Sequence, residues 1–92
     1  MRAYGPEGAG LLRRRLDQLR AVETLDAMRF LPVRCHELTG FREGILSIDI
    51  DGHCRLLFEP VGNPPPVRPD GGLDWSKVTA IRILGEEDTH EQ

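Results

Sequence analysis

The sequence predicts an α+β fold in which two N-terminal helices pack on a small antiparallel sheet. Apolar residues recur at helical spacing up to residue 20, two β-type runs flank an Asp-Gly pair, and a third β-type run precedes an acidic tail. Helices followed by consecutive strands are typical of this class. The 92 residues have room for one domain, over residues 1–92, with one modest core.

The first helix is expected to begin near Pro6. Proline has no backbone N–H, and the first turn of a helix does not use one. It extends to about Arg20 and presents an apolar stripe to the core, formed by Ala9, Leu12, Leu16 and Leu19. Charged residues occupy the opposite side: Arg13, Arg14, Asp17 and Arg20.

A second, short helix is expected from Leu25 to about Arg29. Thr24 precedes it and has a side chain suited to an N-cap. Pro32 lies beyond its end and cannot continue the helix.

Two β-type runs follow, Ile45–Ile50 and His53–Phe58, and Asp51-Gly52 joins them. An Asp-Gly pair between such runs predicts a hairpin in which both turn positions have positive φ. The sequence therefore places two neighbouring strands in the middle of the sheet.

The stretch from Pro60 to Gly72 contains five prolines and three glycines, so it is expected to be a long surface loop. A third strand is expected at Lys77–Leu84, where β-branched residues return. Gly85 is expected to end that strand.

The formal charge of −3 is mildly acidic and by itself counts against nucleic-acid binding. The charge is uneven, however. Residues 1–34 carry seven arginines and four acids, whereas residues 35–92 carry five basic residues and eleven acids, so the first part can face a polyanion. No apolar run approaches the ~18 residues of a membrane span, and the start lacks the apolar segment of a secretory signal. A cytoplasmic protein with reduced thiols is expected.

Cys35-His36 and His53-Cys54 look like paired metal ligands, but their spacing argues against a metal site. Adjacent residues in an extended chain point to opposite faces, so each pair offers a single ligand. The sequence therefore predicts no metal, and the two cysteines are interpreted as small core residues.

Three side chains indicate chemistry when they are considered together: His36, Arg55 and His90. One imidazole can remove the proton of a ribose 2′-hydroxyl while a second protonates the leaving 5′-oxygen. A guanidinium can stabilise the charge that develops on the phosphate. Considered singly, each residue is compatible with a plain surface position. Together they support a hypothesis of RNA cleavage that needs no cofactor.

Six segments carry a characteristic order of motifs: Tyr4–Pro6, Leu11–Ala21, Leu31–Leu38, Leu46–Asp49, Arg55–Pro60 and Asp70–Leu84. In this order the chain resembles the HigB-like killer-protein toxins of the RelE/ParE superfamily. The resemblance extends over nearly the whole chain. Its most specific part is the Gly-Gly-Leu-Asp-Trp segment that leads into the last predicted strand.

The resemblance implies the toxin of a type II toxin–antitoxin system, an mRNA interferase that cleaves ribosome-bound mRNA and inhibits translation. Its implied partners are a helix-turn-helix (HigA-like) antitoxin, the ribosome and mRNA. By position, His36 and His90 would be the acid–base pair. Arg55 would hold the scissile phosphate, and Asp88 would orient or tune a histidine. RNA or ribosome contacts are expected of Arg13, Arg14, Arg20, Thr39 and Arg42.

The chain departs from the family at three points. Thr39 replaces a lysine of the family, and Thr89 replaces the tyrosine of an Asp-Tyr-His ending. The family's first strand has no counterpart, which leaves a sheet edge open to a loop, a partner or a second copy in a homodimer. The acids around His90 repel phosphate and favour the protonated imidazole, which suits an acid.

Two alternatives stay open. A family member that has lost catalysis through Thr39 and Thr89 would still act as an antitoxin-binding module. An unrelated α+β adaptor would use the proline-rich loop as a recognition segment. Growth arrest on expression would favour the toxin over both.

Overall fold

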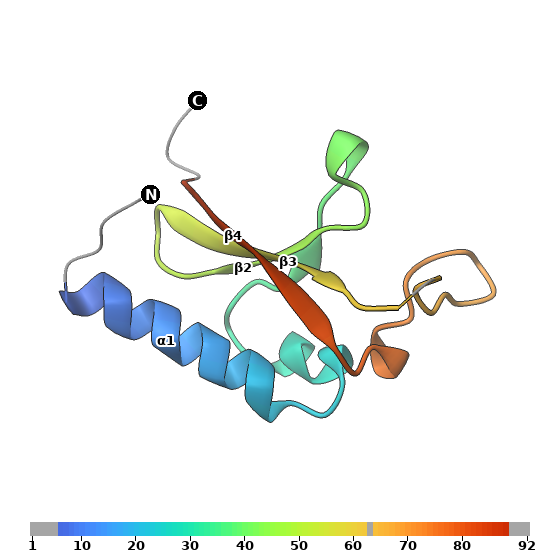
Figure 1. Cartoon of the computed structure of the whole chain (residues 1–92), viewed down its shortest axis with the longest axis horizontal. Coiled ribbons are helices and arrows are strands. Elements are labelled where there is room, and N and C mark those ends of the chain that lie inside the picture. Colours follow the sequence, from blue (N-terminus) through green and yellow to red (C-terminus); the bar gives the residue numbers. More distant parts are fainter. Residues whose placement is uncertain (1–5, 63, 89–92) are drawn as a thin grey trace.

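The computed structural model describes residues 6–62 and 64–88, which form helices packed on one face of a four-stranded sheet (Figure 1). The elements follow in the order α1 (Pro6–Ala21), the 3-10 helix η1 (Leu25–Phe30), β1 (His36–Glu37), the 3-10 turn η2 (Gly40–Arg42), β2 (Leu46–Asp49), β3 (Cys54–Pro60), the 3-10 turn η3 (Trp75–Lys77) and β4 (Ile81–Asp88). The predicted α+β class is confirmed. No strand precedes α1 within the described ranges, and residues 1–5 lie outside them.

The strands lie in the order β1-β2-β3-β4, and each is antiparallel to its neighbours. β3 is paired on both sides, with Leu46 of β2 opposite Phe58 and Glu87 of β4 opposite Arg55. The two edges of the sheet differ in length, because β1 has two residues and β4 has eight.

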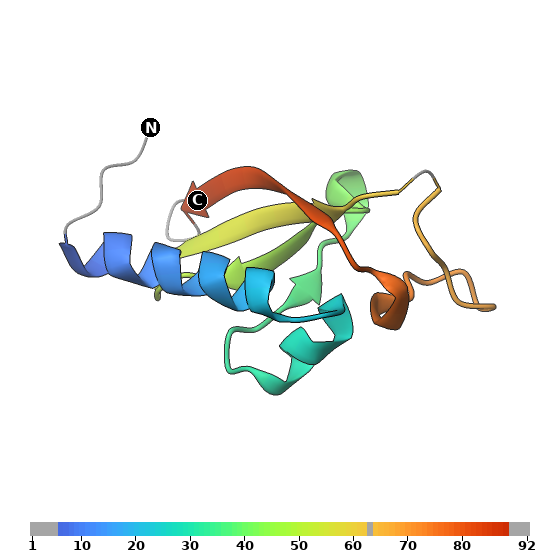
Figure 2. The ribbon, with the colours of Figure 1, turned by 60° about the horizontal axis from the view of Figure 1, so that its bottom comes forward.

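Alternate residues of the central strands face the helices and form the core. Leu46 and Ile48 of β2 and Leu56 and Phe58 of β3 are at most 2% exposed. The remaining buried apolar side chains come from η1 and the connecting segments: Leu25, Met28, Val33, Ile50, Cys54, Trp75 and Val78. Figure 2 shows α1 and η1 on the same side of the sheet. The residues between the core positions therefore point to the opposite face.

α1 begins at Pro6, as predicted. The leucine stripe is half-buried against the core, and the charged side is exposed: Arg13, Arg14, Asp17 and Arg20. Arg15 ties the helix to the sheet, because its Nε donates to the backbone oxygen of Asp49 at 2.7 Å. Among the described residues, no helix is both long enough and apolar enough to cross a membrane.

The second predicted helix is present as η1, a 3-10 helix. Thr24 occupies its N-cap, but the threonine side chain makes no capping hydrogen bond. The backbone N–H of Leu25 instead donates to the oxygen of Val78 at 2.9 Å. A tertiary contact thus replaces the predicted local cap.

The hairpin between β2 and β3 is confirmed, but the predicted turn is wrong. Neither Asp51 nor Gly52 has positive φ. Oδ1 of Asp51 accepts hydrogen bonds from the backbone N–H groups of His53, at 2.7 Å, and Cys54, at 2.8 Å. The aspartate side chain organises the connection, so no residue in the left-handed region is needed.

The last strand begins later than predicted. Trp75–Lys77 form η3, and Asp74 caps this turn by accepting a hydrogen bond from the backbone N–H of Ser76 at 3.1 Å. The strand therefore starts only at Ile81.

The same strand also ends later than predicted, because it passes through Gly85 and continues to Asp88. Gly85 has a φ of +145° and pairs with Leu57, whereas Ile83 pairs with Phe58. Leu84 is therefore an extra residue, as in a β-bulge. Glycine adopts this conformation without the strain of a side chain, so it bends the strand and does not end it.

The loop predicted at Pro60–Gly72 is confirmed apart from Pro60, which is the last residue of β3. Among the described residues, a β-bridge between Val67 and Leu73 closes the loop near its end. The loop leads into η3, whose Trp75 is buried in the core.

Candidate functional site

The face of the sheet opposite the helices carries a row of charged residues. By register, Asp49 of β2, Arg55 of β3 and Glu87 of β4 lie side by side. His36 of β1 lies opposite Ser47, which is two residues from Asp49 along β2. His36 and Arg55 therefore share a face, and standard strand spacing puts their Cα atoms about 12 Å apart.

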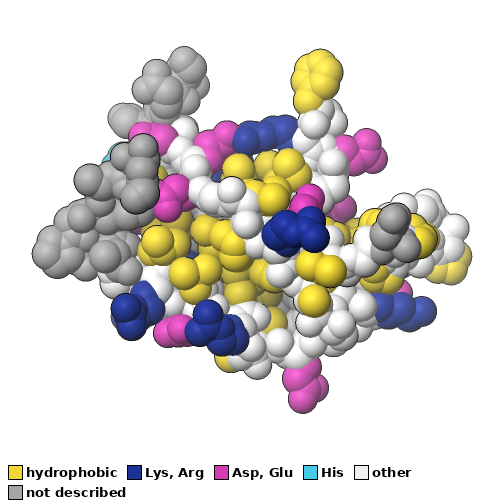
Figure 3. Space-filling view, viewed as in Figure 1, with side chains coloured by type: hydrophobic (Ala, Val, Ile, Leu, Met, Phe, Trp, Pro, Cys, Tyr) yellow, Lys and Arg dark blue, Asp and Glu magenta, His cyan; other side chains and the backbone are white. Residues whose placement is uncertain are grey.

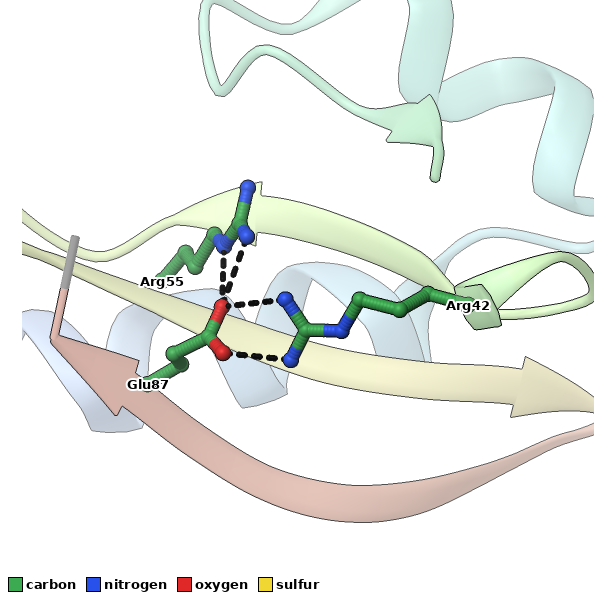
Figure 4. A network of polar contacts seen from close by, with 3 residues as sticks. All are labelled: Arg42, Arg55 and Glu87. Atoms are coloured by element: carbon green, nitrogen blue, oxygen red, sulfur yellow. Dashed lines mark hydrogen bonds and ion pairs between the residues drawn. The ribbon is translucent and has the colours of Figure 1, made fainter. Parts of the chain in front are cut away.

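Glu87 binds two arginines at once (Figure 4). Arg55 donates from Nε and Nη2 to Oε1 of Glu87, at 2.8 and 2.6 Å. Arg42 reaches the same carboxylate from η2, with Nη1 donating to Oε1 at 3.0 Å and Nη2 donating to Oε2. Hydrogen bonds from Arg42, and then those from Arg55, hold the pKa of Glu87 below its ordinary value. Two guanidinium groups and one carboxylate leave this cluster with a net positive charge.

The backbone before β1 fixes the orientation of the His36 ring. Nδ1 of His36 lies 2.9 Å from the carbonyl oxygen of Arg34. A carbonyl oxygen only accepts hydrogen bonds, so Nδ1 carries the proton in the neutral ring and Nε2 keeps a lone pair. Arg34 itself has a φ of +53°, and its Nη1 lies 3.8 Å from Oδ2 of Asp49. Nε2 of His36 is thus the nitrogen that can accept a proton.

Asp88, which was expected to orient or tune a histidine, lies on the other face of β4 from the residue opposite Arg55. Asp88 pairs with Cys54, a core residue that is 1% exposed. Neighbours along a strand point to opposite faces, so the acid in front of Arg55 is Glu87. His90, the second predicted acid–base residue, and Thr89 lie outside the described residues.

The remaining predicted RNA contacts fall on two sides of the molecule. Three arginines are exposed on the outer side of α1, which covers the face opposite to Arg55 (Figure 2): Arg13, Arg14 and Arg20. Thr39 is exposed at the N-cap of η2, three residues before Arg42. Arg42 therefore joins Arg55, whereas the helix arginines cannot contact the same phosphate.

Two residues beside the arginines were not among the predicted site residues. Glu87 is one, and only the register shift at Leu84 places it opposite Arg55. Phe41 is the other: it precedes Arg42 in η2 and its side chain is fully exposed. No pattern in the sequence distinguishes Phe41 from a buried aromatic residue.

The interpretation of the cysteines as core residues is confirmed. Cys54 is buried, and Cys35 packs against the core. Burial raises the pKa of the Cys35 thiol to about 12. Within residues 6–62 and 64–88, no three His, Cys, Asp or Glu side chains are grouped as a metal site would require.

A second surface feature lies beside the edge strand β4. A groove of about 310 Å³ separates the C-terminal half of α1 from the start of β4, and apolar side chains line much of it: Leu16, Leu19, Ile81 and Ile83. Figure 3 shows hydrophobic side chains gathered on this face, over α1 and β4. In the described part of the chain, β4 pairs with β3 alone. Such an edge can accept a strand from a partner or from a second copy.

Comparisons with models of protein families, with curated proteins and with solved structures found no match. Functional inference therefore depends on the residues that the sheet brings together.

Proposed function

We propose that this protein is a metal-independent endoribonuclease with a RelE/ParE-like fold, and that it is the toxin of a type II toxin–antitoxin system. The observation that supports this most directly is the position of His36 and Arg55 on the face of the sheet opposite α1 and η1, with Arg42 beside Arg55. A base and two guanidinium groups on one face suit cleavage of a phosphodiester bond.

In the proposed reaction, Nε2 of His36 accepts the proton of the ribose 2′-hydroxyl. The O2′–P bond forms and the P–O5′ bond breaks, which leaves a 2′,3′-cyclic phosphate and a 5′-hydroxyl. Arg55 and Arg42 stabilise the charge on the non-bridging oxygens. The 5′-oxygen takes a proton from a second acid, the role expected of His90.

Two features of η2 support RNA as the substrate. Arg42 supplies a positive charge near the position where Thr39 lacks one. Phe41 exposes its whole ring beside Arg42, so it offers a surface on which a flanking base can stack.

The low overall charge favours mRNA held by the ribosome over free RNA. A chain with a formal charge of −3 gains little from general attraction to RNA. The exposed arginines of α1 lie on the other side of the molecule, where they can face ribosomal RNA: Arg13, Arg14 and Arg20. A helix-turn-helix antitoxin would neutralise the protein by covering the arginine cluster.

The test is cleavage of mRNA in a translation extract by the wild type, by Arg55→Ala and by a matched control. Arg82→Ala is that control, because Arg82 also lies on a strand and pairs with one acid, Glu59, at 2.6 Å. Wild type and Arg82→Ala are expected to stop translation and leave 2′,3′-cyclic termini, and Arg55→Ala to leave the mRNA intact. Equal cleavage by Arg55→Ala would refute the assignment of Arg55.

A second candidate function, an inactive antitoxin-binding module, is favoured by the occupation of both arginines by Glu87. The apolar groove beside β4 also suits a partner. Absence of cleavage and of growth arrest, together with a tight complex with a helix-turn-helix protein from the adjacent reading frame, would establish this alternative.

A further inference from the structure

Arg42 and Arg55 form a site of a kind that needs an anion. Two guanidinium groups repel each other, yet both contact the carboxylate of Glu87 from different elements, η2 and β3. Arg55 is 21% exposed and Arg42 is 38% exposed, so water screens their repulsion only in part. The two guanidinium groups can therefore lie this close together only when an oxyanion lies between them.

The contacts made by Glu87 match those that a phosphodiester makes. Arg42 donates to both carboxylate oxygens, and Arg55 donates twice to one of them. Guanidinium groups bind carboxylate and phosphate oxygens in the same forked geometry. A phosphodiester also carries one negative charge, so an exchange of the two anions leaves the charge of the cluster unchanged.

Glu87 can leave the site without disturbing the fold. It is the last residue but one of the edge strand β4, and its side chain is 31% exposed. Its backbone pairing with Arg55 does not depend on where the carboxylate points. Rotation of one side chain therefore opens both guanidinium groups.

We propose that Glu87 is an internal competitor at a two-arginine phosphodiester site, so that the free protein is autoinhibited until an RNA phosphate displaces the carboxylate. This inference rests on the proposed function, because it takes the RNA backbone as the ligand of Arg42 and Arg55. Binding and cleavage can nevertheless be measured separately.

The direct test is the affinity of Glu87→Gln for a short single-stranded RNA that carries a 2′-O-methyl group at every position and cannot be cleaved through O2′. Glutamine keeps the size of the side chain and removes its charge. Fluorescence anisotropy is expected to show that the variant binds this RNA about tenfold more tightly than the wild type, because the RNA no longer competes with an ion pair of Glu87. The slope of log affinity against log salt is expected to steepen by up to about 0.7, because the variant removes one negative charge from a site for a single phosphate.

The matched control is Glu59→Gln, which removes the same charge from the same face of the sheet. Glu59 lies opposite Arg82 in β4 and accepts a hydrogen bond from that arginine, as Glu87 does from Arg55. Its affinity for the RNA is expected to stay within about twofold of the wild type, because a charge away from the site acts on the RNA only through screened attraction. Thermal unfolding of each variant checks that the fold is retained.

The double variants Arg42→Ala/Glu87→Gln and Arg55→Ala/Glu87→Gln are each expected to lose the gain. Equal affinity of Glu87→Gln and Glu59→Gln, or a gain that survives in both double variants, would overturn the inference. Tighter binding without cleavage by any variant would support the two-arginine site and refute the proposed nuclease. Cleavage that depends on Arg55, with no gain in Glu87→Gln, would support the nuclease and refute the internal competition by Glu87.

Discussion

The contacts of Glu87 are expected to make the stability of the protein depend on pH. Arg42 and Arg55 hold the pKa of Glu87 below its ordinary value in the folded state, whereas the unfolded chain has the ordinary value of about 4.3. Such a carboxyl group stabilises the fold above the ordinary pKa, and the stabilisation is lost as pH falls through the folded-state pKa. Glu87→Gln should therefore be less stable than the wild type at neutral pH and equally stable in acid.

The size of the effect follows from the exposure of the pair that Glu87 forms with Arg55. An exposed ion pair contributes about 0–1 kcal/mol, and a hydrogen bond to a charged group in the interior about 1.5–3 kcal/mol. The side chains of Arg55 and Glu87 are 21% and 31% exposed, so the pair lies between an exposed and an interior ion pair. We expect Glu87→Gln to lower the free energy of unfolding by about 1 kcal/mol at neutral pH, equivalent to a Tm about 4–8 °C lower.

Urea denaturation at constant ionic strength measures this difference. Trp75 is the single tryptophan and is buried, so its fluorescence reports unfolding. The gap between wild type and Glu87→Gln is expected to close as pH falls from the ordinary pKa of a glutamate through the lower folded-state pKa of Glu87. Glu59→Gln is the control, because it measures how much the free energy of unfolding changes when a different carboxylate is removed from this face. A gap of the same size at every pH would refute the reasoning.

Three further predictions concern the core and the backbone. Nε1 of the buried Trp75 donates to Oε2 of Glu37 at 2.9 Å, so Trp75→Phe should lower the free energy of unfolding by about 1–2 kcal/mol in urea denaturation followed by circular dichroism. No change would mean that this bond adds nothing. Because burial raises the pKa of Cys35 to about 12, its thiol should resist iodoacetamide at about pH 8 until the protein unfolds, as mass spectrometry can show. Rapid alkylation of the folded protein would contradict this. Gly85→Ala meets no atom within 4 Å, so its cost of about 1–3 kcal/mol in thermal unfolding comes from the φ of +145° alone. Gly10→Ala, equally uncrowded but in α1, should raise stability by about 0.5–1 kcal/mol, and equal effects at the two glycines would be inconsistent with backbone strain.

The predictable parts of the fold are those in which apolar residues repeat at a regular spacing. The leucine spacing of α1 and the alternation of β2 and β3 each repeat several times, so the pattern identifies them. β1 was missed because His36 and Glu37 alone cannot establish a period. The predicted end of β4 was wrong because a glycine in a β-type run can either end the strand or form a bulge. Only the pairing with β3 decides between these two outcomes.

The candidate site was predictable in its residue types and not in its contacts. Arg55 and His36 were identified from chemistry and resemblance, and the sheet does place them on one face. The contact between Arg42 and Glu87 joins residues 45 positions apart. Such a contact depends on the register of β4, which no local pattern contains. For the same reason Glu87 was not identified as the acid opposite Arg55.

The unpaired Leu84 determines the parity of every later position on β4. If the pairing were regular beyond Ile83, Arg55 would lie opposite Glu86, and Asp88 would point the same way as Glu86. The additional residue inverts this order within a run of three consecutive acids. One inserted amino acid after Gly85 would reverse the order again, so that the carboxylates of Glu86 and Asp88 would lie on the face of Arg55. Which acid meets the guanidinium is therefore a matter of counting residues, and it can change between relatives without the loss of a single charge.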